Sequence, residues 1–456
     1  MKHCLRTFTA SAVATACLLI GCERDFSATP GGDDLRFSAD TLSFDTLYAG
    51  YSSPTGRITL RNVGDYDVTV GRVFLEGGDV SDFSVNINGL SATEATNMRL
   101  GHGDSLYIFV SVRNAKALEG RAFNTLTDHI VAQGGANTWR ATVTAVVRNV
   151  TAAPLKIESD TQWLCDTIPY LVRDTLDVAE GATLLVGPGV TVLMEKAAAI
   201  CVAGNMAVAG EVDNRTSFSP LRSDGYYETI PGQWGGIIVS AGGRADIRFA
   251  DVACSASGIA CDSASTVFID GLWVRDVSHT GVTLNKVSAE VRNTIVSDCG
   301  GGAFNVTGGD VRLRHVTVSD YFSWDYRHVS ALQFNHTEGE TSKLTVYNSI
   351  IFGNQTSEIA VDSLSAEFVT FRSSLLKMDK KTVSKAEDVF IDCKLNNNAH
   401  FANRSEADYH LTSQSDAVGL ADPALTSDMP TDIEGTLRVD GEPWNAGALQ
   451  TVTEEE

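Results

Sequence analysis

Hydrophobic and polar residues alternate along the chain from residue 35 to about residue 150, and turn-forming residues recur between the apolar runs. Alternation with period two indicates strands that bury one face and expose the other. Runs of this kind occupy residues 57–62, 68–70, 106–112 and 139–147. About seven short strands in a stretch of this size predict an immunoglobulin-like β-sandwich over residues 35–150.

The pattern changes from residue 165 onward, where short apolar runs are separated by glycine-rich turns without a helical period of useful length. Six-residue apolar motifs recur downstream at an interval near 22 residues. They begin at Phe249, Ile269, Val291, Leu313 and Val346. Such a repeat predicts stacked coils whose strands form parallel sheets. We therefore expect an all-β chain with a β-solenoid over residues 165–400.

The third position of each motif carries a residue that readily adopts turn conformations. These residues are Asp251, Gly271, Asn293, His315 and Asn348. Residues 231–239 (PGQWGGIIV) combine a turn, a large aromatic residue and two adjacent glycines. We expect Trp234 to fill the solenoid interior, and Gly235 and Gly236 to ease a tight corner of the backbone.

Several phrases of the chain are similar to known families. Residues 168–204 (IPYLVRDTLDVAEGATLLVGPGVTVLMEKAAAICVAG), followed by PGQWGGIIV, resemble the opening coils of right-handed parallel β-helix proteins with a pectate-lyase-like fold, notably surface lipoproteins of the Bacteroidota. The phrases SFDT, ITLRNVGD, LGHGDSLYIFVSV and ATVTAVV resemble bacterial Ig-like modules. Residues 401–450 resemble the closing segment of the same β-helix proteins, which implies a cap over the open sheet edges. Residues 451–456 are an acidic tail.

The N-terminus has the features of a targeting segment. Two basic residues precede an apolar stretch, residues 8–20, that is too short to span a bilayer, so we assign residues 1–21 as a signal peptide. The sequence Leu-Ile-Gly-Cys that ends at Cys22 resembles a bacterial lipobox, which implies acylation of Cys22 and a polar linker to residue 34. We expect a lipid-anchored protein of the outer membrane, exposed at the cell surface. An ordinary secretory signal with an incidental cysteine is the alternative.

The charge balance is strongly acidic, with 57 Asp and Glu against 35 Lys and Arg, a formal net charge of -22. This balance argues against nucleic acid as a partner. Six cysteines follow the proposed anchor, at positions 165, 201, 254, 261, 299 and 393, and none has the spacing of zinc ligands. Their even number permits disulfides, but their strand positions favour small buried thiols.

Three acidic residues, Asp276, Asp298 and Asp320, follow the motifs at intervals of 22 residues. Stacked coils lie about 4.8 Å apart, so these carboxylates would be neighbours on one edge. Such a ladder would hold a cation such as calcium or act as an acid–base set. The alternative is a turn position at which each Asp caps its own backbone. We assign no catalytic residue, no metal ligand and no resident cofactor.

The coil before Val346 is longer than its neighbours and contains aromatic and polar residues that could contact a ligand. They are Tyr321, Trp324, Asp325, Tyr326, Arg327 and His328. Aromatic faces suit sugar rings, and a loop that leaves a rigid scaffold often carries function. The alternative is a loop that folds its rings over the solenoid wall. Residues 222–228 form a second polar–aromatic excursion, whose flank the sequence does not fix.

The predicted function is a non-catalytic module at the cell surface that binds a glycan or a neighbouring cell. A polysaccharide lyase or glycoside hydrolase that works in a β-helix groove is one alternative, and a purely structural surface protein is another. The chain lacks GxSxG, P-loop and HExxH motifs. The fold class alone does not decide among these three readings.

Overall fold

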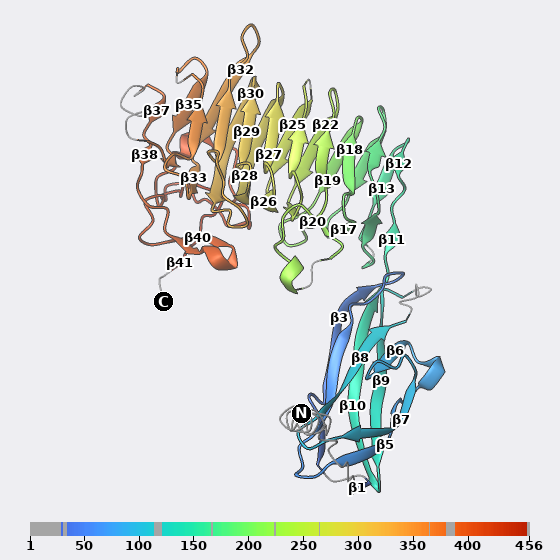
Figure 1. Ribbon diagram of the computed structural model, residues 1–456. Helices are drawn as coiled ribbons and strands as arrows, with labels where there is room; N and C mark the ends of the chain where they lie inside the picture. The colour runs from blue at the N-terminus through green and yellow to red at the C-terminus, as the bar shows by residue number, and fades with distance from the viewer. Residues whose placement is uncertain are drawn as a thin grey trace, which may run out of the picture. The chain divides into compact units, whose positions relative to one another are not determined.

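The computed structural model describes residues 29–30, 34–113, 121–165, 167–222, 225–263, 265–363, 365–379 and 388–453. The chain divides into two compact units, Met1–Asn149 and Val150–Glu456, each of which is described by itself (Figure 1). The described residues contain strands and four short 3-10 turns, so the all-β prediction is confirmed. No helix of this part is long and apolar enough to cross a membrane. The predicted signal peptide and Cys22 lie outside the described residues.

The first unit is a β-sandwich, which confirms the immunoglobulin-like prediction. One sheet has the order β1-β5-β9-β10-β3, with β7 beside β5, and the other has the order β2-β4-β8-β6. Alternate residues of strands β2 to β10 meet in a single buried core, as the period-two pattern requires. The strands are β1 (Thr29–Pro30), β2 (Leu35–Phe37), β3 (Thr41–Tyr48), β4 (Gly56–Asn62), β5 (Val68–Leu75), β6 (Phe83–Ile87), β7 (Glu94–Leu100), β8 (Ser105–Val112), β9 (Phe123–Gly134) and β10 (Asn137–Arg148), with a 3-10 turn at Gly78–Val80.

The second unit is a β-solenoid built from parallel strand pairs, visible as a row of aligned arrows in Figure 1. A 19-stranded sheet contains two ladders of such pairs. One ladder comprises β13 (Thr161–Trp163), β16 (Thr183–Val186), β19 (Asn205–Ala209), β22 (Arg244–Arg248), β25 (Thr266–Asp270), β28 (Ser288–Cys299), β30 (Gly309–Asp320), β32 (Ser342–Tyr347), β35 (Val369–Arg372) and β37 (Phe390–Ile391). The other shares β28 and β30 and adds β11 (Thr151–Ala152), β14 (Tyr170–Val172), β17 (Thr191–Met194), β20 (Thr216–Pro220), β23 (Ala250–Ala253), β26 (Trp273–Val277), β33 (Ile350–Gly353), β36 (Leu375–Leu376) and β38 (Lys394–Leu395).

A separate sheet of nine strands completes the wall of the solenoid. Its strands are β12 (Lys156–Ile157), β15 (Leu176–Val178), β18 (Ala199–Val202), β21 (Gly236–Val239), β24 (Ile259–Cys261), β27 (Val282–Asn285), β29 (Phe304–Thr307), β31 (Leu332–Asn335) and β34 (Ile359–Val361). Apolar side chains from all three ladders point inward and form one continuous core. This core explains why equivalent positions of successive coils are apolar. The parallel strands begin at Thr151, ahead of the expected start at residue 165.

The register of the coils corrects one predicted motif. Ile247 pairs with Ile269, so the motif assigned to Phe249 begins two residues earlier and the interval of 22 residues is kept. Phe249 itself is the corner residue equivalent to Gly271, with a φ of 43°. A bulky apolar residue at a corner resembles the start of a strand, so the apolar pattern places this motif two residues late. The predicted corner residue Asp251 instead pairs with Trp273.

The other predicted corners are confirmed by positive φ angles. They are 75° at Gly271, 43° at Asn293, 50° at His315 and 51° at Asn348. Such angles favour glycine and asparagine, since a Cβ atom is strained there.

The segment around Trp234 forms part of the solenoid core, as predicted. Trp234 is 1% exposed, and its indole N–H donates to the carbonyl of Ala253 at 2.8 Å. Gly236 has a φ of +113°, and a Cβ atom there would lie 1.9 Å from the carbonyl oxygen of Ser257. The motif therefore belongs to the fold and not to a surface site.

The C-terminal segment, residues 398–453, packs along the side of the solenoid, whereas the prediction is a cap over its open end. The corner residues form hydrogen bonds with the C-terminal segment. His315 Nε2 lies 2.9 Å from Thr426 Oγ1, and Asn348 Oδ1 accepts from the N–H of Asp422 at 2.9 Å. Burial lowers the pKa of His315 well below its usual range. The segment contains β39 (Phe401–Asn403), β40 (Asp408–Thr412) and β41 (Val452–Thr453), with 3-10 turns at Arg404–Glu406 and Pro423–Leu425.

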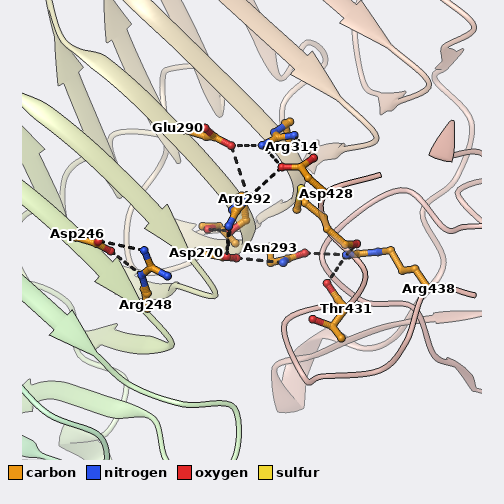
Figure 2. A network of polar contacts seen from close by, with 12 residues as sticks. Asp246, Arg248, Asp270, Glu290, Arg292, Asn293, Arg314, Asp428, Thr431 and Arg438 are labelled. Carbon is orange, nitrogen blue, oxygen red and sulfur yellow. Dashed lines mark hydrogen bonds and ion pairs between the residues drawn. The ribbon is translucent and has the colours of Figure 1, made fainter. Parts of the chain in front are cut away.

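A polar network also fastens this segment to the solenoid (Figure 2). Asp428 pairs with Arg314 at 2.7 Å and with Arg292 at 3.2 Å. Arg438 donates to the side-chain oxygen of Asn293 at 3.0 Å and to the carbonyl of Thr431. The contacts with Arg314, Arg292 and Asn293 join residues more than a hundred positions apart, and the segment and the coils belong to one compact unit.

Candidate ligand-binding cleft

A cleft of about 620 Å³ lies on the flank of the solenoid unit. Its walls come from the coil edge, from the long loop after β30 and from the C-terminal segment. The lining residues are Thr229, Asp276, Asp298, Ser319, Tyr321, Ser323, Trp324, Phe401, Ala402, Asn403, Arg404, Ser405 and Tyr409. Two of the three predicted aspartates and two residues of the predicted aromatic set therefore share one site.

Asp276 and Asp298 occupy equivalent corners of successive coils, with φ angles of 55° and 51°. The guanidinium of Arg275 pairs with Asp276 at 3.1 Å, and the hydroxyl of Tyr409 donates to Asp298 at 3.2 Å. Burial raises the pKa of Asp276 to about 6, although Arg275 opposes the shift, and the nearby Asp298 carboxylate adds to it. Burial also raises the pKa of Asp298, against the hydrogen bond from Tyr409.

Asp320 does not join this pair, which corrects the prediction of a three-carboxylate ladder. Its side chain is fully buried, accepts the N–H of Cys299 at 2.9 Å and faces the guanidinium of Arg327 at 3.5 Å. Arg327 also pairs with Glu358 at 2.7 Å. Among the described residues, no group of three or more His, Cys, Asp or Glu side chains could hold a metal ion. This part of the chain therefore contains no cluster of side chains that supports the expected calcium site.

The buried cluster of Asp320, Arg327 and Glu358 holds one guanidinium between two carboxylates, and all three side chains are 0% exposed. One cation cannot neutralise two anions in a dry interior, so a proton is favoured on one of the carboxylates. Burial accordingly raises the pKa of Asp320 to about 7, while Arg327 opposes the shift. Arg327 was predicted among the ligand-contacting residues, but it lies inside the protein, where its charge has partners.

The remaining residues of the predicted loop are exposed to different degrees. Trp324 is 42% exposed at the cleft, and Tyr321 lies beneath the guanidinium of Arg404, 3.7 Å from its ring centre. Tyr326 is 69% exposed and stacks edge-on against His328, with ring centres 4.6 Å apart. Asp325, Tyr326 and His328 are at the surface but do not line the cleft.

The described end of the second excursion, residues 225–228, lies on the same flank as the long loop. The ring of Tyr226 meets that of Trp324 edge-on, with centres 6.0 Å apart, and Tyr226 is 72% exposed. Arg222 stacks over Tyr227 at 3.5 Å. The sequence left the flank of this excursion open, and the contact between Tyr226 and Trp324 settles it.

The C-terminal segment contributes one wall of the cleft, which no pattern in the sequence predicts. Phe401, Arg404 and Tyr409 reach the cleft from a segment about a hundred residues beyond Asp298. No local period or motif marks them, and their place depends on the lateral packing of that segment.

The predicted buried role of the cysteines is confirmed for Cys254, Cys261 and Cys299. Cys201 and Cys393 are partly exposed and Cys165 is exposed, and all six described cysteines are free thiols. Burial raises the pKa of Cys254 and Cys261 to about 12, so these thiols are unreactive at neutral pH.

No family model matches the chain, and no curated protein does. Solved structures with a partial likeness include the Vibrio cholerae VesB protease (14% identity, TM-score 0.17), the YadV chaperone (12%, 0.18) and the E. coli chaperone DraB (17%, 0.17). Each match covers 25% of this chain and, respectively, 32%, 52% and 54% of the other chain. The chain thus spans a third to about half of these structures, and likenesses of this size do not bear on function.

Proposed function

We propose that the protein is a surface-displayed, lipid-anchored binding protein that holds a glycan in the cleft. The observation that carries this proposal is the meeting of an exposed aromatic ring with half-buried carboxylates at one site. Trp324 offers a flat face to a sugar ring, and the carboxylates of Asp276 and Asp298 offer acceptors for hydroxyl groups. Arg404, which also lines the cleft and lies over the ring of Tyr321, adds donors.

The cleft also has the construction that specific recognition requires. Asp298 is held in place by Tyr409, and Asp276 by Arg275, so neither acceptor must be ordered when a ligand arrives. Trp324 is supported edge-on by Tyr226. A ligand therefore meets polar groups that are already oriented.

One observation favours a second candidate, a glycoside hydrolase or polysaccharide lyase. Asp276 and Asp298 occupy equivalent corners of successive coils in the cleft, and burial raises the pKa of both carboxyls, as in the carboxyl pairs that cleave glycosidic bonds by acid–base catalysis. Release of reducing sugar or of an unsaturated uronate product from a bound glycan would establish this activity, and Asp276→Asn would abolish it.

A glycan array probed with the full chain tests the binding proposal, and the same array probed with Trp324→Ala shows whether the cleft is responsible. We expect a defined set of glycans to bind and the variant to lose them. Tyr66→Ala is the matched control, because Tyr66 is 77% exposed on the sandwich unit and is not a lining residue of the cleft. Equal array profiles for both variants would contradict the proposal.

The anchor has its own test. Cys22→Ala is expected to leave the protein unlipidated and released from membranes, because acyl chains supply stable attachment. Protease treatment of intact cells then reports surface exposure of the native protein. Retention of the variant in the membrane fraction would refute the assignment of Cys22 as the anchor.

A further inference from the structure

The outer face of the sheet β2-β4-β8-β6 differs in charge from the rest of the chain. Its four strands contain three arginines, Arg36, Arg57 and Arg61, and neither Asp nor Glu. All three arginines are exposed. The protein as a whole has a net charge of -22, so a sheet face without carboxylates is a local exception. We call this surface the arginine face.

The strand register places these groups side by side. Arg36 is directly opposite Arg61, and Arg57 is directly opposite Phe109. Tyr107 follows on the same side of β8, where it is 45% exposed, and Phe109 is 39% exposed. The guanidinium of Arg57 also lies 6.0 Å from the ring centre of Tyr107. The arginine face thus combines cations and aromatic rings on a flat sheet.

The structure shows no carboxylate partner for these three arginines among the described residues, although Arg57 lies near the ring of Tyr107. Within the described residues, none of the three forms an ion pair, whereas Arg72 and Arg140 of the other sheet pair with Glu94 and Glu76. Like charges directly opposite each other on a sheet are destabilising, so the Arg36–Arg61 pair costs stability in the free protein. An anion bound between them would remove that cost.

We propose that the arginine face binds an acidic polysaccharide, separately from the cleft of the solenoid unit. Guanidinium groups pair with carboxylate or sulfate in a two-pronged geometry, and Tyr107 and Phe109 provide faces on which sugar rings stack. The rings are two residues apart on one strand, about 7 Å, so neighbouring units of one chain can contact both. The flat surface suits an extended polymer better than a small enclosed ligand.

Binding of the full chain to polygalacturonate, a carboxylated polymer, and to heparin, a sulfated one, tests the proposal, with neutral dextran as the reference. We expect binding to at least one acidic polymer, weakened by added salt, and none to dextran. The double variant Arg36→Ala/Arg61→Ala should lower the affinity about ten-fold, and Tyr107→Ala/Phe109→Ala by a similar factor. Arg140→Ala is the matched control and should bind as the parent does.

Three outcomes would overturn the proposal. The first is equal affinity of the Arg36→Ala/Arg61→Ala variant and the control. The second is a loss of acidic-polymer binding in Trp324→Ala, which would assign that binding to the cleft. The third is preferential, arginine-dependent binding to phosphatidylglycerol vesicles, which would make the partner a lipid surface. Thermal melting of the Arg36→Ala/Arg61→Ala variant checks that it is folded. Removing the like-charged pair should leave the sandwich at least as stable as in the parent.

Discussion

Replacing Arg327 with Met tests how the aromatic loop is held on the solenoid. The guanidinium donates to Glu358 at 2.7 Å, to the carbonyl of Asp320 at 2.8 Å, to that of Val329 at 2.6 Å and to Asn354 at 3.0 Å. These contacts join the start and the end of the loop that carries Trp324 to the following coil. The substitution leaves two buried carboxylates without their cation.

The expected loss of stability in Arg327→Met follows from the burial of the three charged side chains. The side chains of Arg327, Asp320 and Glu358 are each 0% exposed, so solvent cannot replace the lost partner. Breaking a buried ion pair by removing one partner costs about 3–5 kcal/mol. Protonation of both carboxylates would relieve part of this cost, so we expect about 3 kcal/mol at neutral pH.

Urea unfolding of the full chain, followed by circular dichroism and by tryptophan fluorescence, measures the effect. The two units need not unfold together, so the transition of the solenoid unit must be fitted separately. The triple variant Arg327→Met/Asp320→Asn/Glu358→Gln should recover at least half of the loss, because its buried groups are neutral. Arg248→Met removes a half-exposed pair with Asp246 and is the control, with less than about 1 kcal/mol expected. A loss below about 1 kcal/mol for Arg327→Met would show that the buried ion pairs do not hold the loop on the solenoid.

Three further predictions concern stability. Folding raises the pKa of Asp320 to about 7, so the protonated carboxyl stabilises the folded state. This contribution is complete below about pH 4 and is lost as the pH rises through 7. The melting temperature of Asp320→Asn, relative to that of the parent, should therefore rise between pH 4 and pH 8. Gly236→Ala should cost about 3 kcal/mol or more in urea unfolding, because its Cβ would meet a carbonyl oxygen at 1.9 Å, whereas Gly242→Ala, with a φ of +83° and open space, should cost about 1 kcal/mol. Arg314 lowers the pKa of Asp428, so their pairing is present above the ordinary Asp pKa and is lost as the pH falls through the lowered value; Asp428→Asn should speed hydrogen exchange in the C-terminal segment at neutral pH and lose that effect in acid.

The architecture could be predicted because a solenoid repeats its constraints. Every coil must bury the same positions, so the spacing of Ile269, Val291 and Leu313 is enough to predict the period of the coils. The corner glycine and asparagines follow from backbone strain in the same way. The one register error arose at Phe249, where a large apolar side chain occupies a corner that small or polar residues occupy elsewhere.

The site could be predicted only in part, because its walls come from distant segments. Asp276 and Asp298 were placed by the coil period, and Trp324 by the composition of its loop. The burial of Arg327 depends on Glu358, which lies on the next coil, and a loop rich in polar residues does not reveal that contact. Tyr409 reaches the cleft through packing across more than a hundred residues, which no local pattern encodes.

In the proposed function, Trp324 and the aspartates of the cleft hold a glycan. Isothermal titration of the full chain with the glycan that the array identifies measures this interaction. Loss of the Trp324 ring should lower the affinity at least about ten-fold, equivalent to about 1.4 kcal/mol, and Asp298→Asn should lower it further, while Tyr66→Ala binds as the parent does. Unchanged affinity in Trp324→Ala and Asp298→Asn would contradict the claim.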